Sequence, residues 1–267
     1  MRVHVGCEFS YDAQVATHAV IQVEPRLNGG VTALDEHWAN QPLIGMSRYM
    51  DSYGNVCRRV TIPPGVSSLR YDALLEVPEA ADPERLDAAE LAPDDLPDDA
   101  LVYTLPSRFC PSQELADDAW RLFGSSPRGW RRVQTICDWV HSEVTFGYLD
   151  TRPLATALDV FASRAGVCRD FAHLAVTFCR ALNIPARYAF GYLPDIDVPV
   201  SPDPMDFCAW MEVFLDGRWW TFDPRNNQRR VGRALIARGR DSLDVAMIST
   251  YGGPALTSMT VWADQVT

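Results

Sequence analysis

Strand-like and helix-like patterns of hydrophobic residues divide the chain into two parts. In the N-terminal part, residues 3–11 and 18–23 are strand-forming residues in partial alternation. Residues 47–50 and 56–62 flank the turn sequence DSYGN, an arrangement typical of a hairpin. A further strand is predicted over 69–77. We therefore expect a small antiparallel β-sandwich in this part of the chain.

After residue 106 the spacing of apolar residues becomes helical. Ser112 is a suitable N-cap for the first predicted helix. The clearest pattern begins at Cys168, where one apolar face continues to Leu182 before Pro185 stops the helix. The predicted helices cover residues 113–123, 128–142, 156–163 and 168–182.

Strands are predicted again after the last of these helices. The pair Asp216-Gly217 is a hairpin turn signal between two of them. Helices packed on an antiparallel sheet define an α+β fold class. We expect residues 1–106 to form the β-sandwich domain, including an acidic linker at 78–106, and residues 107–267 to form the core domain. The predicted strands cover residues 186–193, 209–215, 219–222, 243–249 and 258–263.

Composition and charge limit the classes of partner. The net charge of −11 over 267 residues argues against nucleic acid. Nine acidic residues and one arginine lie between Glu79 and Asp99, which predicts a solvated segment. The chain shows no apolar run that could span a membrane and its start does not resemble a secretory signal. We expect no membrane partner and a cytoplasmic location, and a homo-oligomer is compatible with the sequence.

The seven cysteines are scattered, and none forms a CxxC pair or a zinc-finger spacing. We therefore expect mostly reduced thiols packed as small hydrophobic residues, no motif-type metal site and no cofactor.

Cys168 is the strongest candidate for a reactive residue. It opens a predicted helix, where unpaired backbone N–H groups and the helix dipole favour a thiolate and can hold an oxyanion. Gly166 allows a close backbone approach. Two later strands each place a polar residue near one end, Cys208 and Asp223, as in a Cys-His-Asp nucleophile site. A structural cysteine and a turn-forming aspartate before Pro224 are the alternatives.

Several segments between residues 155 and 224 carry a family resemblance: TALDV (156–160), GVCRDFAHL (166–174), CRALNIPARY (179–188), GYL (191–193), AWMEV (209–213) and WWTFDP (219–224). With these segments, residues 155–224 resemble the transglutaminase-like superfamily, in its bacterial branch with a papain-like core. The N-terminal β-region and residues 238–263 are also similar to family members, so the resemblance covers most of the chain. It implies an N-terminal antiparallel β-sandwich followed by a papain-like core of helices packed on an antiparallel sheet.

The resemblance implies that Cys168 is the nucleophile and Asp223 the orienting carboxylate. It also leads us to expect a general-base histidine at the position where this chain has Cys208. Tyr148 and Trp210 are candidates for oxyanion or substrate contacts, and core packing is the alternative for both.

Neither histidine of the core domain is an obvious replacement. His173 lies five residues after Cys168 on the predicted helix, roughly 140° away around its axis at about 100° per residue. His141 lies near the end of the preceding predicted helix. A thiol is a poorer general base than imidazole near pH 7 and cannot bridge two partners as imidazole does.

Three interpretations stay open. The protein is a cysteine peptidase or amidase that acts on peptide or isopeptide amides of a peptide or protein substrate, with impaired or altered catalysis, and with hydrolysis preferred over transamidation. It is a non-catalytic peptide-binding pseudoenzyme. Or Cys168 and Cys208 form a disulfide, or share a metal with Asp223. The structural alternative is that Cys208 is a small buried residue, natural or engineered, in the place of a histidine.

Overall fold

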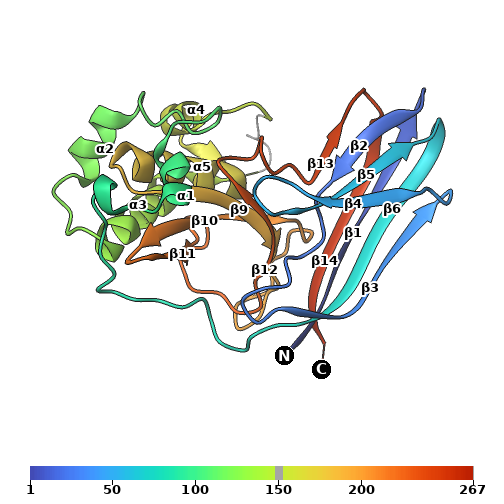
Figure 1. Ribbon diagram of the computed structural model, residues 1–267, viewed down its shortest axis with the longest axis horizontal. Helices are drawn as coiled ribbons and strands as arrows, with labels where there is room; N and C mark the ends of the chain where they lie inside the picture. The colour runs from blue at the N-terminus through green and yellow to red at the C-terminus, as the bar shows by residue number, and fades with distance from the viewer. Residues whose placement is uncertain (148–152, 267) are drawn as a thin grey trace.

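The computed structural model describes residues 1–147 and 153–266, and its fold is α+β. A helix-rich half and a β-rich half lie side by side, and the two chain ends lie close together at the edge of the β-rich half (Figure 1). In the described part of the chain, no helix is long and apolar enough to cross a membrane.

Two antiparallel sheets form the β-rich half, with strand orders β14-β1-β6-β3 and β13-β2-β5-β4. Burial alternates along much of β1 and β6 because one face of their sheet packs on the core. The predicted strands of this half are found, and β3 is added to them. The bounds are β1 Arg2–Ala13, β2 Thr17–Ile21, β3 Thr32–Gln41, β4 Met46–Met50, β5 Val56–Ile62, β6 Gly65–Glu76, β13 Ile248–Thr250 and β14 Ala255–Val266.

The C-terminal strands belong to the β-sandwich and not to the core. Strand β14 pairs with β1 from the Arg2–Val266 pair to the Asp12–Ala255 pair, and β13 pairs with β2. The expectation that all of residues 107–267 form the core domain is therefore wrong for these strands. The pattern of a single strand indicates which face is buried and does not identify its partner strand, so the sequence could not place them.

The helix-rich half packs its helices on a sheet of order β11-β10-β9-β12. Helix α2 begins at Ala116 with Leu115 at its N-cap, so Ser112 does not have the predicted capping role. Strand β12 was not predicted, whereas most of the strand expected over 243–249 is absent. The bounds are α2 Ala116–Phe123, α3 Trp130–Glu143, β7 Thr145–Phe146, α4 Ala157–Ser163, β8 Ala165–Gly166, α5 Cys168–Ala181, β9 Ala186–Tyr192, β10 Cys208–Leu215, β11 Arg218–Phe222 and β12 Ala234–Gly239.

The acidic segment after β6 packs on the core and is not solvated throughout. Its short helix α1 (Asp98–Leu101) is flanked by 3-10 turns at Pro93–Asp95 and Val102–Thr104. Ala100 is buried against Phe214 of β10. Asp82 pairs with Arg233, which lies 151 residues further along the chain. Local charge density does not indicate such a long-range partner.

The two halves share one hydrophobic core. Phe9 of β1 stacks with Phe207, the residue before β10, with ring centroids 6.4 Å apart. Tyr192 at the end of β9 donates a hydrogen bond from its hydroxyl group to the Val23 carbonyl oxygen at 3.0 Å. Cys168 packs against the same core. The starts of α5 and β10 therefore lie where the two halves meet.

Candidate active site

The start of α5 is capped by a side chain from its own first turn. The Asp170 carboxylate accepts a hydrogen bond from the Val167 backbone N–H at 2.9 Å, which satisfies one of the groups left open at the helix start. A Cβ atom on Gly166 would lie 2.6 Å from Cβ of Asp170, so this close approach requires glycine. The sequence Gly-Val-Cys-Arg-Asp thereby fixes Cys168 as the first residue of the helix.

Cys168 is a partly exposed residue at this helix start. Its Sγ lies 3.8 Å from the Phe207 carbonyl oxygen. A hydrogen bond from the Cys208 thiol lowers the pKa of Cys168 below the ordinary value of 9.0, against the opposing effect of burial, and the Ala209 backbone N–H also lowers it. The helix dipole acts in the same direction. These contacts favour the thiolate, which is the nucleophilic form of cysteine.

Cys208 begins β10 and is 7% exposed. The hydrogen bond that it donates to Cys168 raises the pKa of Cys208 well above 9.0, and burial and the charge of Asp223 add to this effect. Cys208 therefore stays protonated near neutral pH. Its Sγ also lies 3.7 Å from the Ala209 carbonyl oxygen.

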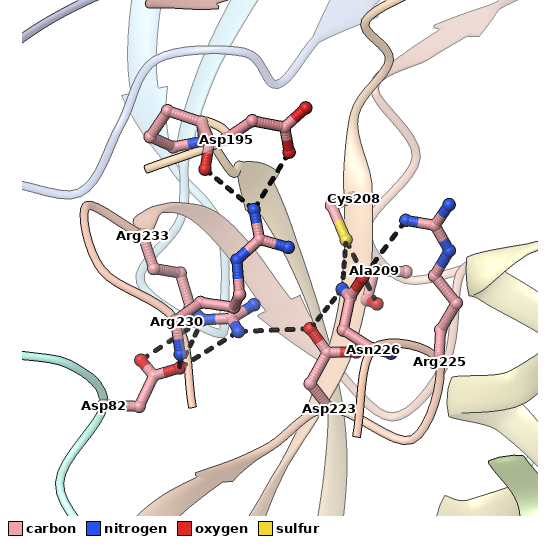
Figure 2. Close-up of polar contacts among 10 residues, drawn as sticks. Asp82, Asp195, Cys208, Ala209, Asp223, Arg225, Asn226, Arg230 and Arg233 are labelled. Carbon is pink, nitrogen blue, oxygen red and sulfur yellow. Dashed lines mark hydrogen bonds and ion pairs between the residues drawn. The ribbon is translucent and has the colours of Figure 1, made fainter. Parts of the chain in front are cut away.

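Asp223 follows β11 and is bound by residues other than Cys208. Asn226 donates to it twice, from its backbone N–H at 2.9 Å and from Nδ2 at 2.8 Å. Arg233 lies 3.1 Å from the same carboxylate and 3.0 Å from that of Asp82. Figure 2 shows these residues as a connected series that reaches Cys208, whose Sγ lies 4.0 Å from Asn226 Nδ2. The amide of Asn226 thus stands between the carboxylate and the sulfur.

Cys168 and Cys208 lie where two cavities meet. The larger cavity has a volume of about 580 Å³ and the smaller one about 250 Å³. Asp223 lines neither of them and faces a third cavity together with Asp82. Of the three residues predicted to be catalytic, the structure brings the two sulfurs together and places the carboxylate behind Asn226. The larger cavity has apolar walls that include Phe109, Tyr188, Phe190, Leu243, Val245 and Met247, and the smaller has charged walls that include Asp203, Asp206, Arg225 and Arg230.

Two charged residues beside the sulfurs were not among the predicted site residues. Asp206 lines both cavities and accepts a hydrogen bond from the Phe207 backbone N–H at 2.7 Å, and burial raises its pKa. Arg225 lies over the Phe146 ring and donates to Asn226 Oδ1 at 3.4 Å. After the hydrogen bond from Cys208, the weaker influences on the pKa of Cys168 include Asp206, which raises it, and Arg225, which lowers it. The polar run RNNQRR after Pro224 is a sequence signal for Arg225 and Asn226, whereas no local signal singles out Asp206 or Arg233.

The two aromatic candidates have different outcomes. Tyr148 lies outside the described residues, so its role stays a prediction. Trp210 is 1% exposed and lines neither cavity, and the Arg233 guanidinium lies 4.3 Å from its ring centroid. The structure therefore gives Trp210 a packing role in place of the predicted substrate contact.

The described residues that line the two cavities include no histidine. His173 is buried, its ring stacks on Phe109, and its Nε2 accepts a hydrogen bond from the Ser242 backbone N–H at 3.1 Å. Burial lowers the pKa of His173 well below 6.5. His141 is held by the Arg225 carbonyl oxygen, 2.8 Å from its Nδ1. As expected from the sequence, neither ring replaces Cys208 as a partner of Cys168.

All seven cysteines lie in the described part of the chain and carry free thiols. Among the described residues, no three His, Cys, Asp or Glu side chains lie close enough together to hold a metal ion. One alternative from the sequence was a metal site made of Cys168, Cys208 and Asp223. The structure does not bring these three side chains together in such a site, because Asp223 is bound by Asn226 and Arg233 instead.

The fold and the position of Cys168 define a class of α+β proteins with a cysteine at the start of a helix that packs on an antiparallel sheet. A model of the transglutaminase-like superfamily matches residues 121–224. The crystal structure of a candidate cysteine protease from Cytophaga hutchinsonii is 30% identical to this chain, with a TM-score of 0.88, and the match covers 98% of this chain and 90% of that one.

Two uncharacterized mycobacterial proteins are also similar to this chain. The protein of Mycobacterium leprae is 25% identical over 98% of this chain and 96% of its own length. The protein of Mycobacterium tuberculosis is 27% identical over 73% of this chain and 68% of its own length. This chain belongs to the transglutaminase-like superfamily, which confirms the resemblance found in the sequence.

Proposed function

We propose that this protein is a cysteine peptidase or amidase that uses the Cys168 thiol to attack peptide or isopeptide amides. The observation that carries this proposal is the position of the Cys168 sulfur, at the start of α5 and at the junction of two cavities. Backbone N–H groups at a helix start stabilise a thiolate before the attack and an oxyanion after it. The similarity to the candidate cysteine protease of C. hutchinsonii is a second support.

In the proposed reaction, the Cys168 thiolate attacks the carbonyl carbon of a peptide or protein substrate. An acyl-thioester forms while the amine leaves with a proton, and water then hydrolyses the thioester. The apolar cavity suits the acyl part of the substrate, and the smaller, charged cavity suits the leaving group. The two cavities thus correspond to the two sides of the bond to be broken.

Cys208 changes how the proton is handled. We propose that it stands where the family's general base would be. A thiol with a raised pKa donates to the Cys168 sulfur but does not take up and return a proton near pH 7. Asp223, which would orient an imidazole, is occupied by Asn226 and Arg233. Amide cleavage should therefore be slow, whereas an activated ester, whose phenolate leaves without a proton, should acylate Cys168 readily.

A second candidate function is a protein that binds a peptide in the cleft without cleaving it. The observation in its favour is that the described residues lining both cavities include no histidine. The two candidates differ in one measurable step, which is the acylation of Cys168.

A matched pair of substrates tests this step. We would use the p-nitrophenyl ester and the p-nitroanilide of the same N-acylated apolar amino acid. With the ester, intact-mass analysis should show one acyl group, mapped to Cys168, while anilide cleavage should be slow. The Cys208→His variant should increase anilide cleavage about a hundredfold to ten-thousandfold, the gain typical of a positioned acid–base group.

Two variants control this experiment. Cys168→Ala should abolish acylation, whereas Cys179→Ala removes a buried thiol from the same helix and should leave it unchanged. A folded wild-type protein that neither carries an acyl group on Cys168 nor releases p-nitrophenolate faster than the Cys168→Ala variant would exclude the enzyme proposal. Calorimetric titration with the uncleaved peptide would then test the binding candidate.

A further inference from the structure

The two sulfurs in the cleft form a pair that acyl transfer does not require. Cys168 packs against the small cluster that contains Cys208, and both residues line both cavities. The other five cysteines, at 7, 57, 110, 137 and 179, are buried and line neither of these cavities. A small reagent that enters the cleft therefore reaches these two thiols before any other thiol in the chain.

The members of the pair differ in access and in charge state. Cys168 is partly exposed, whereas Cys208 is 7% exposed and its Sγ lies 3.7 Å from the Ala209 carbonyl oxygen. The pKa of Cys168 is lowered and that of Cys208 is raised, so the more exposed sulfur of the pair is the one that forms a thiolate more readily. Exposed, thiolate-forming cysteines beside a second cysteine are the ones that oxidise reversibly, because the second thiol traps the first oxidation product.

We propose that Cys168 and Cys208 are a peroxide-reactive dithiol that a small hydroperoxide converts into a reversible intramolecular disulfide. This inference goes beyond the proposed acyl transfer and does not depend on it. Two fixed elements hold the reacting atoms. The start of α5 is closed by Asp170, and β10 is held in its sheet by the pairing of Cys208 with Gly191.

The reaction balances in two steps. In the first, the Cys168 thiolate attacks one peroxide oxygen and the O–O bond breaks. A sulfenic acid forms on Cys168, and the second oxygen leaves as hydroxide or alkoxide, which takes a proton from water. In the second, the Cys208 sulfur attacks the sulfenic sulfur, the S–O bond breaks, and water leaves with the Cys208 proton. The peroxide gains two electrons and each sulfur loses one, so two thiols and one hydroperoxide give one disulfide, one alcohol or water, and one water.

The disulfide would block the reactivity of Cys168 in the cleft. Its formation shortens the contact between the sulfurs to a bond of about 2.05 Å, and it removes the thiolate from the junction of the cavities. It also keeps Cys168 from oxidising further to the irreversible sulfinic acid. A dithiol reductant should restore both thiols by exchange.

Proteolytic cleavage after arginine places the two cysteines of the pair in different peptides, so a disulfide between them can be identified by mass spectrometry. Cys168 falls in the peptide 165–169 and Cys208 in the peptide 188–218, and neither peptide contains another cysteine. After a short exposure of the folded protein to a small excess of hydrogen peroxide, we expect two of the seven thiols to be lost and these two peptides to be joined. Dithiothreitol should restore both thiols. Cys168 should react at least about tenfold faster than Cys179, which lies buried on the same helix.

The Cys208→Ser variant keeps the size of the side chain and removes the second sulfur. In this variant, we expect dimedone to trap a sulfenic acid on Cys168, and longer exposure to give a sulfinic acid that dithiothreitol does not reverse. The proposal is overturned if wild-type Cys168 reaches the sulfinic acid while Cys208 stays reduced, if the disulfide joins other cysteines, or if Cys168 oxidises no faster than Cys179. All three readouts come from wild-type protein, so a folding defect in the variant would not remove the test. Because thiol mapping requires no substrate, its outcome is independent of the acylation experiment.

Discussion

The two ends of the candidate site are built in opposite ways. At the thiol end, Cys168 is partly exposed and opens onto two cavities. At the carboxylate end, the side chain of Asp223 is 2% exposed and that of Arg233 is 7% exposed, and both are tied to partners. One end leaves a thiol residue partly exposed, and the other pairs buried carboxylates with a buried guanidinium.

This difference suggests separate roles for the two ends of the site, one in reactivity and one in the stability of the fold. A carboxylate that orients a base must offer an oxygen to it, but Asp223 directs its oxygens to Asn226 and Arg233. Through Arg233 the same network also holds Asp82, and with it the acidic segment that connects the two halves of the protein. We infer that the carboxylate end stabilises the fold, while reactivity belongs to the two sulfurs.

The largest expected effect is at the carboxylate end. Arg233→Met leaves the buried charges of Asp223 and Asp82 without their cation, and removing one partner of a buried pair costs about 3–5 kcal/mol. Urea denaturation of the variant should show this loss in the free energy of unfolding. The double variant Arg233→Met/Asp223→Asn should recover part of the loss, because it removes one of the unpaired charges. A loss below about 1 kcal/mol in the single variant would contradict a stabilising role for this end.

The second-largest expected effect is the difference in labelling rate between Cys168 and Cys179, which lie near opposite ends of α5. The pKa of Cys168 is lowered by the hydrogen bond from Cys208, whereas burial raises that of Cys179. Thiolate is the reactive form, and its fraction falls as the pH drops below the pKa. At pH 7, iodoacetamide should therefore label Cys168 at least about a hundredfold faster than Cys179 in the folded protein. Peptide mapping after brief labelling measures this ratio, and equal rates would remove the basis for a nucleophile at the helix start.

The smallest expected effect concerns the two charges beside Cys168. The hydrogen bond from Cys208 is the main influence on its pKa, and the carboxylate of Asp206 and the guanidinium of Arg225 are weaker and opposite ones. Asp206→Asn should increase the labelling rate of Cys168 at pH 7 by about two- to fivefold, and Arg225→Gln should decrease it by a similar factor. Raising the salt concentration should shrink both changes, because it screens charges at partly exposed sites. Shifts in the same direction for the two variants would contradict an electrostatic origin.

Much of the core domain could be predicted because its elements have local signals. Gly166 and Asp170, which lie next to Cys168 in the sequence, define the start of its helix. The hairpin turn at Asp216-Gly217 has positive φ at both positions, as the sequence suggested. Strand β3 and the position of β14 could not be predicted in the same way. Their hydrogen bonds are made with strands far away in the chain, and one strand's pattern does not specify its partner.

The sequence by itself determined the fold class, the start of α5 and the identity of the two cleft cysteines, because helix ends and strand patterns are set by neighbouring residues. The tertiary structure decided what those residues do to one another. It placed the Cys208 thiol against Cys168, put Asn226 between Cys208 and Asp223, and brought Arg233 and Asp82 together across 151 residues. Hydrogen bonds and charges act over a few ångströms, so their partners depend on distances in space that no local sequence pattern records.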